Sequence, residues 1–106
     1  MKTVKILKLK TLNMIITEKM IKDQVKSYLD LMGYFHFPLT QGFASYPGLP
    51  DRIAVNQKGQ VYFIECKRPV GSIHSKVQIK FQQNIERQHG NYLLVHNLEE
   101  LIEGLK

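Results

Sequence analysis

The sequence predicts an α/β domain in which helices pack against a mixed central β-sheet. Three patterns support this prediction: two amphipathic helical segments that each end at a glycine, a hairpin of two apolar strands, and a short buried strand after the second helix. The expected order is helix, strand, strand, helix, strand, helix, and 106 residues suit a single domain.

The first helix is expected over residues 17–32. Thr17 is a favourable N-cap residue, and Gly33 stands where a helix should end. Glu18 precedes the first apolar position by three residues, so it should share the inward face. The expected buried stripe consists of residues at helical spacing, namely Ile21, Val25, Tyr28, Leu29 and Met32.

Residues 34–50 carry many turn-forming glycines and prolines, which predict a loop with room for one short strand. Segments 51–55 and 61–67 then flank a polar turn, which is a hairpin pattern. With the turn centred on Lys58, Ile53 should stand opposite Phe63.

The second helix is expected over residues 75–89, with Gly90 closing it. Phe81 and Ile85 form its apolar stripe, and Gln78 lies on the same side. Residues 91–96 follow as a short buried strand. Asn97 then caps a last helix, and Glu100 would complete a capping box.

Composition narrows the class of protein. No apolar run approaches the roughly 20 residues of a membrane span, and no amphipathic helix rich in lysine and aromatics predicts a membrane surface. The net charge of +6 favours a polyanionic partner such as nucleic acid.

Residues 1–16 form a separate basic arm or strand that lacks the features of a signal peptide. With Cys66 as its single cysteine, the chain is expected in a reducing compartment, the cytoplasm.

The hairpin register brings chemistry-bearing residues together. Asp51 should stand opposite Glu65, with Cβ atoms about 4.5–5.5 Å apart. Two carboxylates so close repel, and a divalent cation such as Mg²⁺ relieves that repulsion. Lys67 lies two residues after Glu65, so it should project from the same face. The Cys66 backbone carbonyl could reach the same ion. This arrangement suits metal-assisted hydrolysis of a phosphodiester.

Plainer interpretations of these residues remain open. Asp51 could be a polar residue that starts a strand, and Glu65 with Lys67 could be an exposed strand face. Val61 and Phe63 share that face, and a mixture of apolar and ionic residues favours a site at the edge of a core. Glu18 could serve only the helix dipole, and Gln78 could be a surface residue.

At these positions the sequence resembles a known family. Pro50-Asp51 followed by Glu65-Cys66-Lys67 is similar to the PD-(D/E)xK nuclease signature. The longer pattern, residues 48–51, then 63–69, then Gln78, resembles the VRR-NUC (virus-type replication-repair nuclease) domain over residues 17–103. The domain boundary is therefore placed at 17–106, as in stand-alone members of viral or phage type.

The resemblance implies a restriction-endonuclease-like core and an endonuclease that depends on Mg²⁺ or Mn²⁺ and acts on DNA. Asp51, Glu65 and the Cys66 carbonyl would hold the metal, and Glu18 would contribute directly or through water. Lys67 would act on the attacking water, and Gln78 would support the site. Stand-alone members are associated with homodimers that resolve branched DNA such as four-way (Holliday) junctions.

Five further residues are candidates for contacts to DNA phosphates: Lys58, Arg68, His74, Lys76 and Lys80. Nothing resembles a base-reading helix, so specificity is expected from branch geometry and duplex shape. The rival hypotheses are a non-catalytic DNA-binding module of the same fold and an RNA-processing nuclease.

Overall fold

A computed structural model describes residues 15–40, 42 and 44–106. The expected basic arm therefore lies outside the described residues, apart from its last two positions. No helix in the described part is long and apolar enough to cross a membrane.

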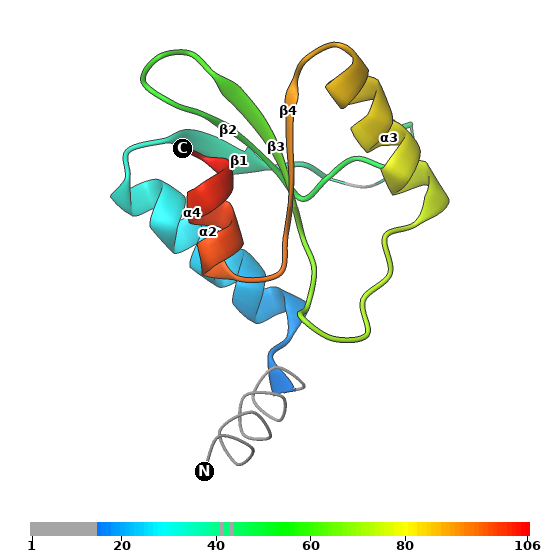
Figure 1. The fold of residues 1–106 in the computed structure, drawn as a ribbon, viewed down its shortest axis with the longest axis horizontal. Coiled ribbons are helices and arrows are strands. Elements are labelled where there is room, and N and C mark those ends of the chain that lie inside the picture. The colour runs from blue at the N-terminus through cyan, green and yellow to red at the C-terminus, as the bar shows by residue number, and fades with distance from the viewer. Residues whose placement is uncertain (1–14, 41, 43) are drawn as a thin grey trace.

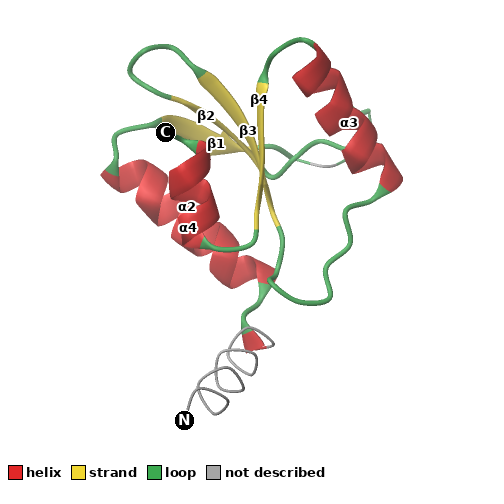
Figure 2. Ribbon diagram, in the orientation of Figure 1, coloured by secondary structure: helices red, strands yellow, loops and turns green. Residues whose placement is uncertain are grey.

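A four-stranded mixed sheet forms the centre of the molecule (Figures 1 and 2). Its strands lie in chain order: β1 (Phe35–Pro38), β2 (Arg52–Val55), β3 (Val61–Cys66) and β4 (Asn91–Val95). The first three strands are antiparallel, and β4 runs parallel to β3. The expected mixed α/β sheet is confirmed, and the loop before the hairpin does contain one short strand, β1. Ile53 pairs with Phe63, as the hairpin register predicts.

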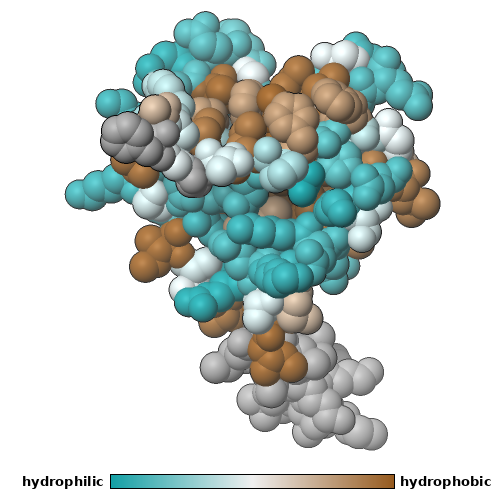
Figure 3. Space-filling model, turned by 180° about the vertical axis from the view of Figure 1, so that it is seen from behind, coloured by the Kyte–Doolittle hydropathy of each residue, from teal (hydrophilic) through white to brown (hydrophobic). Residues whose placement is uncertain are grey.

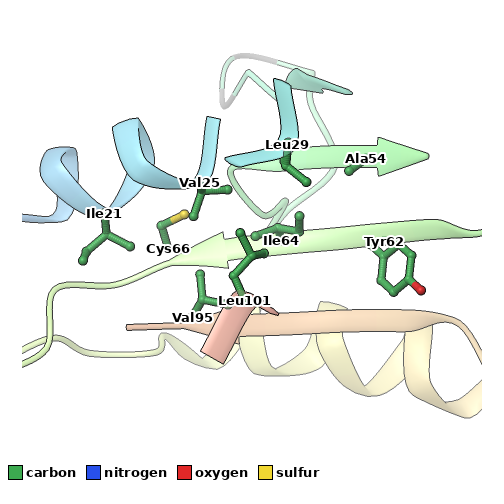
Figure 4. Close-up of a cluster of buried hydrophobic side chains, with 9 residues drawn as sticks. All are labelled: Ile21, Val25, Leu29, Ala54, Tyr62, Ile64, Cys66, Val95 and Leu101. Carbon is green, nitrogen blue, oxygen red and sulfur yellow. The ribbon is translucent and has the colours of Figure 1, made fainter. Parts of the chain in front are cut away.

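Helices α2 (Glu18–Leu31) and α4 (Leu98–Gly104) enclose the main core on one face of the sheet. The core consists of the buried side chains drawn in Figure 4: Ile21, Val25, Leu29, Ala54, Tyr62, Ile64, Cys66, Val95 and Leu101. Because side chains alternate along a strand, the even-numbered positions of β3 enter this core. Its odd-numbered positions, which include Glu65, face the opposite side.

The helix boundaries agree closely with the sequence patterns. Thr17 caps α2, and Ser75 caps helix α3 (Lys76–Arg87). Asn97 caps α4, but only half of the expected capping box forms, because the Glu100 carboxylate turns to His96 Nδ1 at 3.1 Å. Met32 was expected in the buried stripe and is instead 52% exposed. It lies at the C-cap of α2, where the chain leaves the helical conformation.

Helix α3 covers only part of the second face of the sheet, through contacts with β4 and with Phe63. Over β1 and β2, this face carries apolar side chains that the strand register aligns in two rows: Phe35, Val55 and Val61, then Phe37, Ile53 and Phe63. Phe35 and Phe37 are substantially exposed. Figure 3 shows hydrophobic side chains gathered in a band between two hydrophilic projections. We call these six residues the apolar sheet face.

Candidate active site

Asp51, Glu65 and Lys67 meet where β2 begins and β3 ends. Register extended by one residue beyond the Arg52–Ile64 pair places Asp51 opposite Glu65. The Cys66 backbone N–H donates to Asp51 Oδ2 at 2.7 Å, which fixes the aspartate against the end of β3. Glu65 and Lys67 are 3% and 8% exposed, so both ionisable groups are withdrawn from water. Paired charges buried at this depth need specific partners.

Gln78 supplies such a partner from the first turn of α3. Lys67 Nζ donates to Gln78 Oε1 at 3.0 Å and lies 3.3 Å from Glu65 Oε2. Gln78 Nε2 donates to the same Glu65 oxygen. The Ser75 backbone N–H also donates to Gln78 Oε1, at 3.0 Å, so the helix cap holds this side chain in place. The glutamine is therefore a positioning residue for both ionic groups.

A close backbone contact fixes the loop that carries Asp51. Gly48 has φ +80°, and a Cβ atom there would lie 2.2 Å from the carbonyl oxygen of Val77. Only glycine therefore fits, on both conformational and steric grounds. The contact seats the 47–50 segment directly against the first turn of α3. Asp51 and Gln78 thus line the same recess from two segments that are in direct backbone contact.

Lys22 neutralises the acidic groups on the α2 side of the site. Its Nζ lies 3.2 Å from Asp51 Oδ1 and 3.3 Å from Glu18 Oε2. Burial disfavours the Lys22 ammonium, but the two carboxylates outweigh that effect, so the pKa of Lys22 is raised. The site thus combines three carboxyl groups with two ammonium groups. Sequence reasoning missed Lys22, although its spacing of four from Glu18 is that of a helical ion pair.

Burial and the neighbouring Asp51 raise the pKa of Glu65 from 4.5 to about 8, although Lys67 opposes the shift. A carboxylic acid with such a pKa holds a proton at neutral pH unless a cation takes the proton's place. Burial also raises the pKa of the Cys66 thiol to about 12, with Asp51 adding to the effect. Cys66 is therefore an unreactive core residue, as its position facing α2 requires.

The site opens into a recess of about 340 Å³. Its lining includes the ionic groups and the loop that carries them: Glu18, Gly48, Leu49, Asp51, Glu65, Lys67, Ser75, Val77 and Gln78. A second hollow of about 320 Å³ also involves Glu18 and Lys67, and Arg68 reaches it from the other side. The two hollows leave open space beside the carboxylates.

These residues fit a hard divalent cation. Adjacent Asp51 and Glu65 offer oxygen ligands, which Mg²⁺ and Mn²⁺ prefer, and the recess has room for water ligands. Burial, together with the adjacent Asp51, raises the pKa of Glu65, and a bound cation would favour its ionised form. No three His, Cys, Asp or Glu side chains in the described part of the chain converge at metal-binding spacing. A metal here would take Asp51 and Glu65 as its first carboxylate ligands, with backbone carbonyl and water oxygens among the others.

The proposed DNA contacts are not all near the site. Arg68 lines the second hollow and donates to the Gly71 carbonyl at 2.8 Å. Lys76 and Lys80 are exposed on α3. Lys58 lies in the hairpin turn, at the opposite end of the hairpin from Glu65, so the structure does not bring it to the site (Figure 1). His74 bonds to Gln82 at 2.9 Å, and its Nδ1 is buried, so its ring faces the protein rather than solvent.

A cluster of polar side chains that the sequence analysis missed lies next to Asp51, at the start of β2. His36 Nε2 lies 2.5 Å from Asp30 Oδ1, and Arg52 bonds to His36 Nδ1 at 2.9 Å. The His36 side chain is 5% exposed. This chain of polar contacts joins α2, β1 and β2 immediately after Asp51. Its residues are too far apart in the sequence for spacing alone to have revealed it.

A solved structure described as a VRR-NUC domain superimposes on the chain with a TM-score of 0.72 and 16% sequence identity, covering 85% of this chain and 96% of the other. The chain has the VRR-NUC fold. The family resemblance read from residues 17–103 is thereby confirmed at the level of the fold. No family model and no curated protein matches the sequence.

Proposed function

We propose that this VRR-NUC-fold protein is a metal-dependent, structure-selective DNA endonuclease that uses Mg²⁺ or Mn²⁺. The observation that carries the proposal is the convergence of Asp51, Glu65, Lys67 and Gln78 on one recess, with the two acids side by side and the lysine on Glu65. The basic net charge suits a DNA partner. We place the protein in the cytoplasm, because its single cysteine cannot form an internal disulfide.

Asp51 and Glu65 would hold the cation, with the Cys66 carbonyl as a further ligand and Glu18 acting directly or through water. A bound Mg²⁺ or Mn²⁺ supplies the positive charge that polarises the phosphate and acidifies water. Lys67 orients the attacking water or donates to a phosphate oxygen as negative charge develops there. Gln78 keeps the lysine and Glu65 in register, and buried surroundings strengthen each of these interactions.

We further propose that the substrate is branched DNA and that the protein acts on it as a homodimer. One chain offers one site, and resolution of a four-way junction needs two symmetric cuts. The apolar sheet face supports pairing of two copies, because monomeric proteins rarely expose contiguous apolar patches of this kind. Phe37→Lys should therefore shift the molar mass measured by light scattering from dimer to monomer. A wild-type protein that is already monomeric would refute the dimer.

The central experiment compares cleavage of linear, flap and four-way DNA with Mg²⁺, Mn²⁺ or EDTA. Asp51→Asn and Lys67→Met should each lower the cleavage rate by two to four orders of magnitude, because each removes a charge from the reacting centre. Lys19→Met and Asp23→Asn are matched controls, since this ion pair is exposed on α2. Parental rates in the first two variants would refute the assignment.

EDTA separates the rival classes. A nuclease should bind branched DNA in EDTA without cutting it, and it should cut when the metal is restored. A protein that binds equally with and without metal and never cuts would be a non-catalytic module of the same fold. Faster cleavage of matched RNA than of DNA would instead identify an RNA-processing enzyme.

A further inference from the structure

A further cavity, of about 350 Å³ and separate from the two hollows described above, lies against the recess. Its walls are formed by Tyr46, Pro47, Val77, Lys80, Phe81 and Asn84. Val77 lines both the recess and this cavity. Pro47, which lines the cavity, precedes Gly48, which lines the recess. The close backbone contact between Gly48 and Val77 is thus the partition between the two spaces. A molecule bound in this cavity would lie directly beside a substrate in the recess.

Aromatic rings form the apolar part of this cavity. The rings of Tyr46 and Phe81 meet edge to face, with centroids 5.9 Å apart and planes at 68°. Phe81 is in turn held by Phe63 and Tyr92, with centroids at 5.6 Å and 6.2 Å. Phe81 is buried, whereas Tyr46 is 60% exposed. The tyrosine is therefore an exposed ring that rests on a fixed aromatic support.

Polar and basic groups of α3 form the remaining part. Lys80 and Asn84 are one helical turn apart, so they lie on the same side of the helix. Asn84 Oδ1 accepts a hydrogen bond from Arg87 at 3.2 Å, which brings a second cation to this side. Lys76 precedes Lys80 by one more turn. A flat apolar surface is thus bordered by an amide and by a line of positive charge.

We propose that this cavity binds one unpaired nucleobase of the DNA strand whose scissile phosphate occupies the recess. A nucleobase presents a flat π face for Tyr46, a polar edge for Asn84 and a neighbouring phosphate for Lys80. The cavity falls at the lower end of the 300–1,000 Å³ that is usual for small-molecule sites, which suits one base. This inference rests on the proposed function, because it takes DNA as the substrate.

The site accounts for selectivity towards branched DNA without base reading. A base in an intact duplex is stacked and paired, so it cannot enter the cavity without a cost of a few kcal/mol. A base at a junction, flap or strand end is already partly unstacked. Stacking on an aromatic side chain accepts any base, because every base has a π face. The cavity therefore selects DNA structure rather than DNA sequence.

The test measures binding in EDTA, where no cleavage occurs. Full-length protein is titrated into four-way DNA that carries 2-aminopurine at successive positions around the branch, and into a linear duplex of the same sequence. Binding of the wild type should change the fluorescence at one position near the branch. Tyr46→Ala should abolish that change and weaken junction binding roughly 5- to 100-fold. Duplex binding should remain unaltered.

Tyr46→Phe is the matched variant, since it keeps the ring and should retain both the fluorescence change and the affinity. Thermal melts of both variants check that the fold is intact, which is expected for an exposed side chain. Equal weakening of junction and duplex binding by Tyr46→Ala, or no fluorescence change at any position, would overturn the proposal. Tighter binding of branched RNA at this site would overturn its assignment to DNA.

The two proposals fail in different ways. A protein that cuts DNA through Asp51 and Lys67 but is indifferent to Tyr46→Ala keeps its proposed function and loses the base site. A protein with the Tyr46-dependent fluorescence change that never cuts keeps the base site as a feature of a non-catalytic module. A protein that neither binds nor cuts any DNA refutes both.

Discussion

Replacement of Glu65 by glutamine should remove a pH-dependent loss of stability from the metal-free protein. The pKa of Glu65 rises from 4.5 to about 8 on folding, mainly because the side chain is buried and lies beside Asp51. Between these two values the folded state holds a proton that the unfolded state has released. The free energy of unfolding must therefore fall as pH rises through this interval. Glutamine resembles the protonated acid and does not titrate.

The expected size of the effect follows from the same shift. Between about pH 5.5 and about pH 8, the Glu65 carboxyl should lower the free energy of unfolding by up to about 3 kcal/mol, at 1.36 kcal/mol for each pKa unit. Contributions from other groups cancel when the variant and the wild type are compared at each pH. Glu65→Gln should thus match the wild type near pH 5.5 and exceed it near pH 8.

Urea denaturation in EDTA, followed by circular dichroism at both pH values, measures these free energies. Added Mg²⁺ should restore stability to the wild type at the higher pH but not to Glu65→Gln, because only the wild type gains a carboxylate ligand. A wild type and a variant that differ by the same amount at both pH values would refute the reasoning. That result would mean that Glu65 is already ionised in the folded protein at acidic pH.

Two further changes probe the scaffold and the counter-charge of the site. Gly48→Ala should lower the free energy of unfolding by roughly 2–5 kcal/mol, because it combines a left-handed backbone with a clash against Val77. Gly59→Ala, with a similar φ but open space around it, should lose only about 1–2 kcal/mol; equal losses in urea titrations would contradict the steric argument. Lys22→Met should tighten Mn²⁺ binding roughly two- to tenfold in electron paramagnetic resonance titrations without DNA, because an ammonium that competes for Asp51 and Glu18 is removed. The same titration with the exposed Lys26→Met should give wild-type affinity, and unchanged binding in Lys22→Met would show that the lysine does not compete with the metal.

Local signals in the sequence were sufficient for the elements and for the centre of the site. The cap at Thr17, the start of the second helix at residue 75 and the turn around Lys58 depend on neighbouring residues, so the helix starts and the hairpin register could be read directly. That register alone places Asp51 opposite Glu65. The pairing of the two strands thus allowed the paired carboxylates of the site to be predicted from the expected secondary structure.

Interactions between distant segments could not be read in this way. The contact of Gly48 with Val77 and the chain from Asp30 through His36 depend on how loops and helices meet in space. The hairpin also implies that Lys58 lies far from Asp51 and Glu65, so any DNA contact that it makes would be distant from the acidic site. Seven residues of extended chain, at about 3.3 Å each, separate Lys58 from Glu65. A positive charge indicates the class of partner but not the place of contact.

The hydrogen bonds of Gln78 make the start of α3 and Lys67, the proposed catalytic lysine, a single cooperative unit. One amide oxygen accepts both from the helix cap at Ser75 and from Lys67, so fraying of the first helical turn also releases the ammonium. Local unfolding has little effect at most helix ends, but here it would release Lys67 from its position beside Glu65. Catalytic competence should therefore disappear on warming before the sheet melts.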